Sequence, residues 1–208
     1  MLLNLDNIAM KVLPISLVNT EQLSLLLQHL RLIHIFDIPG DVVEMGCFVG
    51  GTSIALQRLL SEIQSSKILH VYDSFEGLPL PDEKDTNRYA GPGSMKVGVA
   101  QLEENFDNAY VKRPVIHKGW FNQLTDVDYP DLVAFAFIDA DYHASVLAAL
   151  ESIYPRLAPN AVCFIHDHSD GTPKTAYFPG VDAACAEFFY DKPEEISIVA
   201  SMGYFFKQ

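Results

Sequence analysis

A nearly continuous apolar run at residues 132–138 ends abruptly in Asp139, and this run constrains the fold more than any other feature of the chain. Because apolar and polar positions do not alternate in it, the run is typical of a strand buried on both faces of a sheet. Shorter segments at 42–45, 68–73, 114–119 and 160–165 predict four more strands. Helical patterns lie between them, which predicts a doubly wound, mostly parallel α/β sheet.

The expected helices cover about 19–36, 52–64, 99–109, 143–157 and 180–190. Asn19 with Gln22 three residues later resembles a capping box at the start of the first of them. Two closing strands, 195–200 and 202–207, are separated only by a short turn, and they predict an antiparallel hairpin at one edge. The complete prediction is one domain, residues 1–208, with a seven-stranded Rossmann-like sheet.

Two segments depart from this regular pattern. Residues 1–18 are apolar but irregular, and together with the next helix they make an N-terminal region, 1–38. We expect the irregular arm to pack on a neighbouring subunit, which predicts a homo-oligomer. Residues 74–98 are rich in residues that interrupt helices and strands, namely Gly77, Pro79, Pro81, Gly91, Pro92, Gly93 and Gly98. A loop of this length is usually functional, so we interpret it as a lid.

Composition excludes several classes of function. The formal net charge of the 208 residues is −13, which disfavours nucleic acid as a partner. No apolar run approaches the roughly 18 residues of a membrane span, and the N-terminus lacks the pattern of a signal peptide. The three cysteines, Cys47, Cys163 and Cys185, are odd in number and widely spaced. We therefore expect reduced, structural thiols in a cytoplasmic protein without a membrane partner.

Acidic or other polar residues stand at the carboxyl ends of four of the five expected parallel strands and a glycine at the other, where open α/β sheets bind their ligands. One such acid alone is commonly a helix cap or a turn residue. Several at the same edge of one sheet indicate a binding site. They are Glu44, Asp73, Gly119, Asp139 and the triplet His166, Asp167 and His168.

The loop after the first strand reads Glu-x-Gly-x-x-x-Gly-Gly, which is neither the dinucleotide fingerprint nor a P-loop. Gly46 permits a sharp turn, and Gly50 and Gly51 would allow another molecule to approach the main chain. Thr52 or Ser53 can cap the following helix. An acid at the end of the second strand, Asp73, can accept hydrogen bonds from both hydroxyls of a ribose.

From these motifs the chain resembles the macrocin O-methyltransferases, a family of class I S-adenosylmethionine-dependent enzymes that methylate hydroxyls of sugars and related natural products. The resemblance covers about residues 20–205, and its most specific part is DSFEGLP at 73–79. The other matching segments are EMGCFVGG at 44–51, KGWF at 118–121, IDAD at 138–141 and YPRLAP at 154–159.

The resemblance implies a role for most of the residues at this edge. Asp73 would bind the ribose of S-adenosylmethionine, Ser74 and Phe75 would lie beside the adenine, and Trp120 and Phe121 would line the pocket. The implied cofactor residues are Glu44, Gly46, Cys47, Gly50, Gly51, Thr52, Ser53, Asp73, Ser74, Phe75, Gly119, Trp120, Phe121 and Asp139.

The resemblance also implies a divalent metal, usually magnesium, at Asp139 and at an acidic pair that falls on His166 and Asp167. Here the chain departs from the family, because His166 replaces an acid and His168 replaces a tyrosine. Three outcomes stay open. Asp139 and Asp167 hold magnesium without His166, or a softer ion such as manganese binds with one histidine, or no metal binds and His166 or His168 is the base.

The expected function is therefore transfer of a methyl group to a hydroxyl of a small-molecule acceptor, with Asp139, His143 and His166 as candidate catalytic residues. Asp141 is expected either to cap the next helix or to contact the acceptor or metal, and His70 and His117 are interpreted as structural. The alternatives are a catechol-type O-methyltransferase and a binder of the cofactor or a nucleoside without transfer activity. A nicotinamide-dependent oxidoreductase is disfavoured by the first loop.

Overall fold

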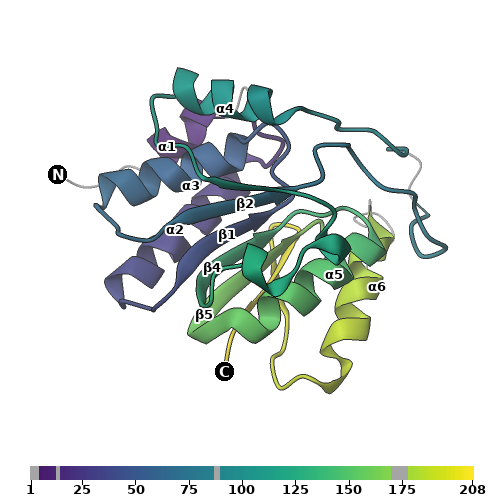
Figure 1. Cartoon of the computed structure of the whole chain (residues 1–208). Coiled ribbons are helices and arrows are strands. Elements are labelled where there is room, and N and C mark those ends of the chain that lie inside the picture. Colours follow the sequence, from purple (N-terminus) through teal and green to yellow (C-terminus); the bar gives the residue numbers. More distant parts are fainter. Residues whose placement is uncertain (1–4, 13–14, 87–89, 170–177) are drawn as a thin grey trace.

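The computed structural model describes the whole chain except residues 1–4, 13–14, 87–89 and 170–177. Its seven strands form one sheet in the order β3-β2-β1-β4-β5-β7-β6 (Figure 1). The first five pair in parallel, and β7 runs antiparallel to both β5 and β6, as predicted. The strands are β1 Asp41–Met45, β2 Leu69–Asp73, β3 Val115–Lys118, β4 Val133–Ile138, β5 Leu157–His166, β6 Ser197–Val199 and β7 Met202–Phe206.

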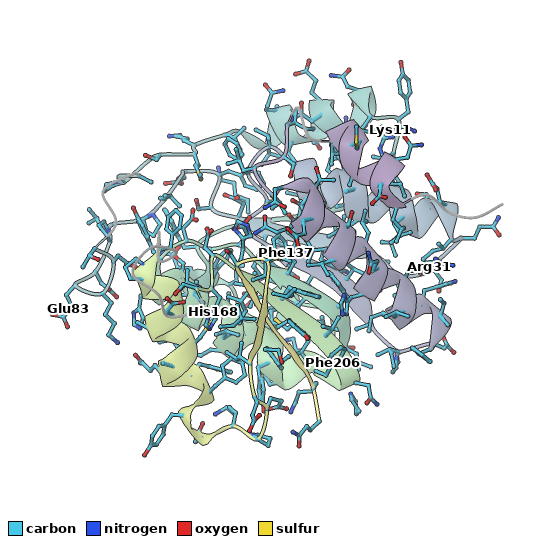
Figure 2. All side chains as sticks on the ribbon, turned by 180° about the vertical axis from the view of Figure 1, so that it is seen from behind. Lys11, Arg31, Glu83, Phe137, His168 and Phe206 are labelled. Atoms are coloured by element: carbon cyan, nitrogen blue, oxygen red, sulfur yellow. The ribbon has the colours of Figure 1, made fainter. Side chains whose placement is uncertain are left out.

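Strand β4 explains why the sheet has helices on both faces. All of its residues are buried between β1 and β5. Phe135 and Phe137 point into one apolar core, whereas Ala136 and Ile138 point into the other. Figure 2 shows the contrast with the surface, where Lys11, Arg31 and Glu83 lie at the periphery while Phe137 lies inside.

Each core is closed by its own layer of helices (Figure 1). The first layer consists of α1 Leu5–Val12, α2 Thr20–Ile35, α3 Gly51–Glu62 and α4 Val99–Asn108, and the second of α5 His143–Ile153 and α6 Pro179–Phe188. Four single turns of 3-10 helix connect elements: Phe121–Gln123, Asp126–Asp128, Tyr154–Arg156 and Phe189–Asp191. None of the helices in the described residues is long and apolar enough to cross a membrane.

The N-terminal region corrects one prediction. Residues Leu5–Val12 form a helix whose Ile8, Ala9 and Val12 are buried against α2 and α3 of the same chain. The segment was expected to be irregular, and the helix corrects that expectation, whereas its packing on a neighbouring subunit stays a prediction. The expected capping box is present, since Asn19 and Gln22 each accept a hydrogen bond from the other's backbone N–H.

Two other boundaries differ from the sequence-based ones. The helix expected at 143–157 ends at Ile153 and continues as a 3-10 turn through Pro155, which lacks the N–H that an α-helix needs. Strand β5 begins at Leu157, earlier than expected, with an irregular pairing to β4. All three cysteines are buried and unpaired in the described chain, as predicted.

Candidate active site

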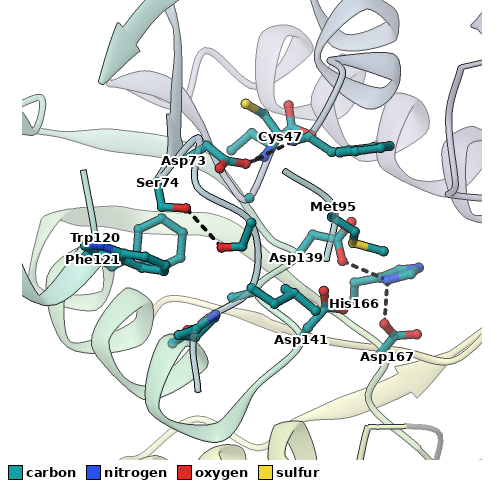
Figure 3. Close-up of a pocket in the computed structure, with 18 of the residues that line it drawn as sticks. Cys47, Asp73, Ser74, Met95, Trp120, Phe121, Asp139, Asp141, His166 and Asp167 are labelled. Carbon is teal, nitrogen blue, oxygen red and sulfur yellow. Dashed lines mark hydrogen bonds and ion pairs between the residues drawn. The ribbon is translucent and has the colours of Figure 1, made fainter. Parts of the chain in front are cut away.

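A pocket of about 550 Å³ lies at the edge where the parallel strands end (Figure 3). Its volume is within the range of small-molecule sites. It is lined by residues that follow β1, β2, β3, β4 and β5, together with the segment 15–18 and parts of 77–95. Of the sequence-predicted residues, the pocket is lined by Glu44, Gly46, Cys47, Gly51, Thr52, Asp73, Ser74, Gly119, Trp120, Phe121, Asp139, His166 and Asp167.

The glycines of the first loop serve the packing of the chain itself. Gly46 has φ +90°, and a Cβ there would lie 2.0 Å from the carbonyl oxygen of Asp139. A Cβ on Gly51 would lie 2.5 Å from Cα of Ser16, and one on Gly50 would meet the Leu102 side chain. These glycines are therefore required by close packing within the chain, and the approach of a ligand to Gly50 and Gly51 stays a prediction.

Asp73 holds the first loop to the end of β2. Its Oδ2 accepts hydrogen bonds from the backbone N–H groups of Cys47 and Phe48, each at 3.1 Å, and Oδ1 accepts one from Phe75 at 2.8 Å. Burial raises the pKa of the Asp73 carboxyl, and these three hydrogen bonds oppose that rise. Because a carboxylate has about four acceptor positions, Asp73 still has acceptor capacity for a ligand.

Glu44 is an acid at the centre of the sheet. It is 2% exposed, and its carboxylate accepts a hydrogen bond from the Ser53 hydroxyl. Burial raises the pKa of Glu44 well above its usual value, and the charges of Asp139 and Asp73 add to this. Ser53 is thus a partner of Glu44 and does not itself line the pocket, contrary to its predicted place there.

Of the residues expected beside the adenine of the cofactor, only some line the pocket. Ser74 lines the pocket and donates its hydroxyl hydrogen to the carbonyl of Gly77 at 3.1 Å. Phe75 does not line it, because a φ of 56° turns the residue so that its ring is buried in the first core. Trp120 and Phe121 lie together on the side of the pocket opposite Asp139, His166 and Asp167 (Figure 3).

The second half of the pocket is an acidic cluster around an imidazole. Nδ1 of His166 lies 2.9 Å from Oδ1 of Asp139 and 3.2 Å from Oδ2 of Asp167 (Figure 3). Burial alone would lower the pKa of His166, but the two carboxylates together raise it well above its usual value. Within the described chain, these three side chains are the group whose donor atoms could hold a metal ion.

Asp141 joins this cluster instead of capping α5. It is buried, lines the pocket and has its pKa raised well above normal by burial and by the charges of Asp139 and Asp167. The first N–H of α5, that of His143, is capped by Asp85 at 2.8 Å. The pocket thus has five acidic residues in its wall, and no lysine or arginine among the described residues that line it.

Backbone strain gathers at the same edge. Phe48, Phe75, Asp141 and Asp167 follow β1, β2, β4 and β5, and each has a φ between 46° and 61°. Such conformations cost free energy in residues other than glycine and commonly occur at functional sites. The carboxyl edge therefore carries several residues in a strained backbone conformation, after four of its five parallel strands.

Two predicted histidines lie elsewhere. His168 does not line the pocket, and its Nδ1 lies 3.0 Å from the carbonyl of Ser169 and 3.3 Å from Asp182. His143 is also outside the lining, so its position argues against the predicted role as a base. His70 and His117 contact each other at 3.0 Å beside the stacked ring of Tyr72, in keeping with a structural role.

His143 instead anchors the loop that follows β2. Its Nδ1 lies 2.8 Å from Asp82, and its Nε2 lies 3.1 Å from both Lys84 and Glu187 of α6. Asp85 is buried beside these residues. It packs closely on Gly180 of α6, because a Cβ added to Gly180 would lie 1.8 Å from Oδ1 of Asp85. Residues 82–85 are thereby fixed to α5 and α6, and whether the remaining loop acts as a lid stays a prediction.

Removal of the Asp85 cap should loosen this loop. We expect Asp85→Ala to lower the free energy of unfolding by about 1–2 kcal/mol, the usual range for a lost helix cap. Hydrogen exchange should rise in residues 78–95 and at the start of α5. The neighbouring Glu83→Ala is the control, because Glu83 is exposed. Equal exchange in both variants would show that Asp85 does not anchor the loop.

Two contributors were missed from sequence. Residues 15–18 form part of the pocket wall, and the Ser16 hydroxyl lies 3.4 Å from that of Thr52. Gln22 contacts His166 although 144 residues separate them. The only local signal for either was the capping box at Asn19, which marks a helix start and says nothing of the site.

Solved structures of methyltransferases share this architecture. The O-methyltransferase NovP superimposes with a TM-score of 0.79 over 93% of this chain and 82% of its own, at 22% identity. The calicheamicin methyltransferase CalS11 gives a TM-score of 0.70 over 97% of this chain and 91% of its own, at 19% identity. The fold is thus that of Rossmann-like O-methyltransferases.

Sequence comparison identifies the family within this class of enzymes. The 8-demethyl-8-(2,3-dimethoxy-alpha-L-rhamnosyl)-tetracenomycin-C 4'-O-methyltransferase of Streptomyces olivaceus is 28% identical over 64% of this chain. The chain spans about half of that relative's length, 54%. The profile of the TylF macrocin-O-methyltransferase family matches residues 10–191, so the chain belongs to this family, as its motifs predicted.

Proposed function

We propose that this chain is an S-adenosylmethionine-dependent O-methyltransferase that acts on a hydroxyl of a sugar or another small natural product. The observation that carries the proposal is the charge of the pocket. Its described wall has five acids and no lysine or arginine, which suits a cationic sulfonium and disfavours the pyrophosphate of a dinucleotide. Membership of the macrocin O-methyltransferase family supports the same reaction.

The chemistry needs little beyond orientation and removal of a proton. When bound, S-adenosylmethionine supplies a methyl group on a positively charged sulfur. Transfer forms a carbon–oxygen bond to the acceptor, breaks the carbon–sulfur bond and requires a base for the hydroxyl proton. Holding the oxygen in line with the methyl group can contribute several kcal/mol. Asp139, at the pocket wall beside His166, is the proposed proton acceptor.

A divalent ion fits the same cluster. The Nδ1 atom of His166 is buried and has no aligned hydrogen-bond partner among the described residues, although two carboxylate oxygens lie within 3.2 Å. That arrangement of one nitrogen and two oxygens suits a cation held by Asp139, His166 and Asp167. Such an ion would orient two vicinal hydroxyls and lower the pKa of the attacked one.

Relatives and the charge of the pocket support the proposed class of acceptor. One similar protein is named for 4'-O-methylation of a rhamnosyl-tetracenomycin. Another is the mycinamicin III 3''-O-methyltransferase of Micromonospora griseorubida, 25% identical over 63% of this chain. Because the described wall has five acids and no lysine or arginine, we favour a neutral glycoside over a nucleotide sugar. A catechol-type acceptor is the second candidate, since Trp120 and Phe121 offer aromatic surface.

Calorimetry tests the cofactor. We expect the protein to bind S-adenosylhomocysteine and not NAD, and Asp73→Asn to weaken that binding about 10- to 100-fold, as for loss of hydrogen bonds to a charged group. Glu76→Gln, an exposed acid in the same segment, is the control. Binding of NAD alone would refute the proposal, and cofactor binding without turnover on glycosides or catechols would favour a binder.

A homo-oligomer and a cytoplasmic location stay predictions.

A further inference from the structure

Two hydrogen bonds to backbone groups determine the orientation of the Gln22 side-chain amide. It lies in the first turn of α2 and is 5% exposed. Its Nε2 donates to the carbonyl of Ala200 at 2.8 Å, and its Oε1 accepts from the N–H of Asn19 at 3.1 Å. Exchange of the two amide atoms would place donor against donor and acceptor against acceptor. The oxygen of Gln22 must therefore be the atom that faces His166.

That oxygen decides which nitrogen of His166 carries hydrogen. Oε1 of Gln22 lies 3.3 Å from Nε2 of His166, and a carbonyl oxygen can only accept. Nε2 must therefore be the protonated nitrogen, and the neutral ring has its lone pair on Nδ1. The ring of Phe137 packs against the imidazole edge to face at 6.0 Å, which further restricts its rotation.

Nδ1 points into the cluster of carboxylates. It is buried, it lacks an aligned hydrogen bond among the described residues, and it lies close to Asp139 and Asp167. One donor atom from each of the three side chains falls within 4.8 Å of the others. A histidine that donates one N–H to a fixed acceptor and turns its other nitrogen toward carboxylates has the arrangement of a metal ligand.

We propose that Asp139, His166 and Asp167 form a mixed nitrogen and oxygen site that selects a first-row transition ion over magnesium, and that Gln22 is its positioning residue. An imidazole nitrogen is a better ligand for first-row transition ions, zinc, iron and nickel above all, than for magnesium, which prefers oxygen ligands. Only the role of the ion in catalysis rests on the proposed function. Ion selectivity itself follows from the donor atoms.

The test titrates the chelator-treated full-length protein with Mn²⁺ and with Mg²⁺. We expect Mn²⁺ to bind at least about 100-fold more tightly, and His166→Asp to reduce that ratio at least about tenfold by making the site all-oxygen. The electron spin-echo spectrum of bound Mn²⁺ should show a directly coordinated nitrogen that His166→Asp removes. A ratio unchanged in His166→Asp, or no bound nitrogen in the wild type, would overturn the site.

Gln22→Met tests the positioning residue. Loss of an outer hydrogen-bond partner should weaken Mn²⁺ binding about 10- to 100-fold, whereas Gln101→Met on the exposed face of α4 should leave it unchanged. Long-range ¹H–¹⁵N spectra of the Zn²⁺-loaded wild type should show the hydrogen of His166 on Nε2. A hydrogen on Nδ1 would refute the role of Gln22 even if the variant does not fold. Calorimetry of the metal-free protein with S-adenosylhomocysteine distinguishes the two proposals. If this compound binds while the metal predictions fail, the metal site is refuted and the proposed function is not.

Discussion

Asp139→Ala should lower the rate of methyl transfer at least about 100-fold while largely preserving affinity for S-adenosylhomocysteine. Loss of a positioned proton acceptor alone typically costs this much. Asp139 also contributes one of the carboxylates beside His166, so the variant should lose most of its affinity for a divalent ion. Initial rates at saturating cofactor, together with calorimetry of the cofactor product, measure the two effects separately.

Asp131→Ala provides the matched control. Asp131 is exposed and precedes β4, whereas Asp139 follows the same strand at its carboxyl end. Both substitutions remove one negative charge, so a general electrostatic effect would appear in both. If Asp139→Ala keeps full activity, the acceptor proton leaves by another route and the assignment of Asp139 is wrong.

Gly46→Ala should destabilise the fold by about 3 kcal/mol or more. A residue with a side chain is strained at φ +90°, and the new Cβ would fall 2.0 Å from the carbonyl oxygen of Asp139. That oxygen is backbone at the end of β4, so relief requires β1 and β4 to separate at the pocket. Urea unfolding monitored by circular dichroism would measure the loss, and cofactor affinity should fall with it.

Gly91→Ala isolates the local clash from the general effect of replacing glycine. A Cβ at Gly91 would meet no described atom within 4 Å. We expect its free energy of unfolding to stay within about 0.5 kcal/mol of the wild type, as for most surface substitutions. Similar losses in the two variants would mean that close approach of β1 and β4 does not limit stability.

Much of the architecture could be predicted because its causes are local. The unbroken apolar run before Asp139 and the short strand before Asp73 indicate buried parallel strands, and their carboxyl ends must meet at one edge. This is why Glu44, Asp73, Asp139 and His166 were placed near one another before any contact was known. The N-terminal helix was missed because its short apolar pattern is ambiguous without the surface that it covers.

The errors at the site have a common physical origin. Phe75 follows Asp73 directly, but a positive φ sends its ring into the core, and a sequence does not display that dihedral angle. His143 follows β4 closely, yet its ring nitrogens contact Asp82 and Glu187 outside the pocket. Both predictions relied on closeness in sequence, which does not decide the direction of a side chain.

The sequence by itself determined which apolar segments are strands, that acids gather at one edge of the sheet, and the family. It also showed that His166 stands where an acid was expected. Only the tertiary structure decided what surrounds that imidazole. Gln22 lies 144 residues away, on a helix whose packing brings its oxygen to Nε2 and so leaves Nδ1 facing Asp139 and Asp167. Contacts between such distant segments depend on how whole layers pack, and no local pattern encodes them.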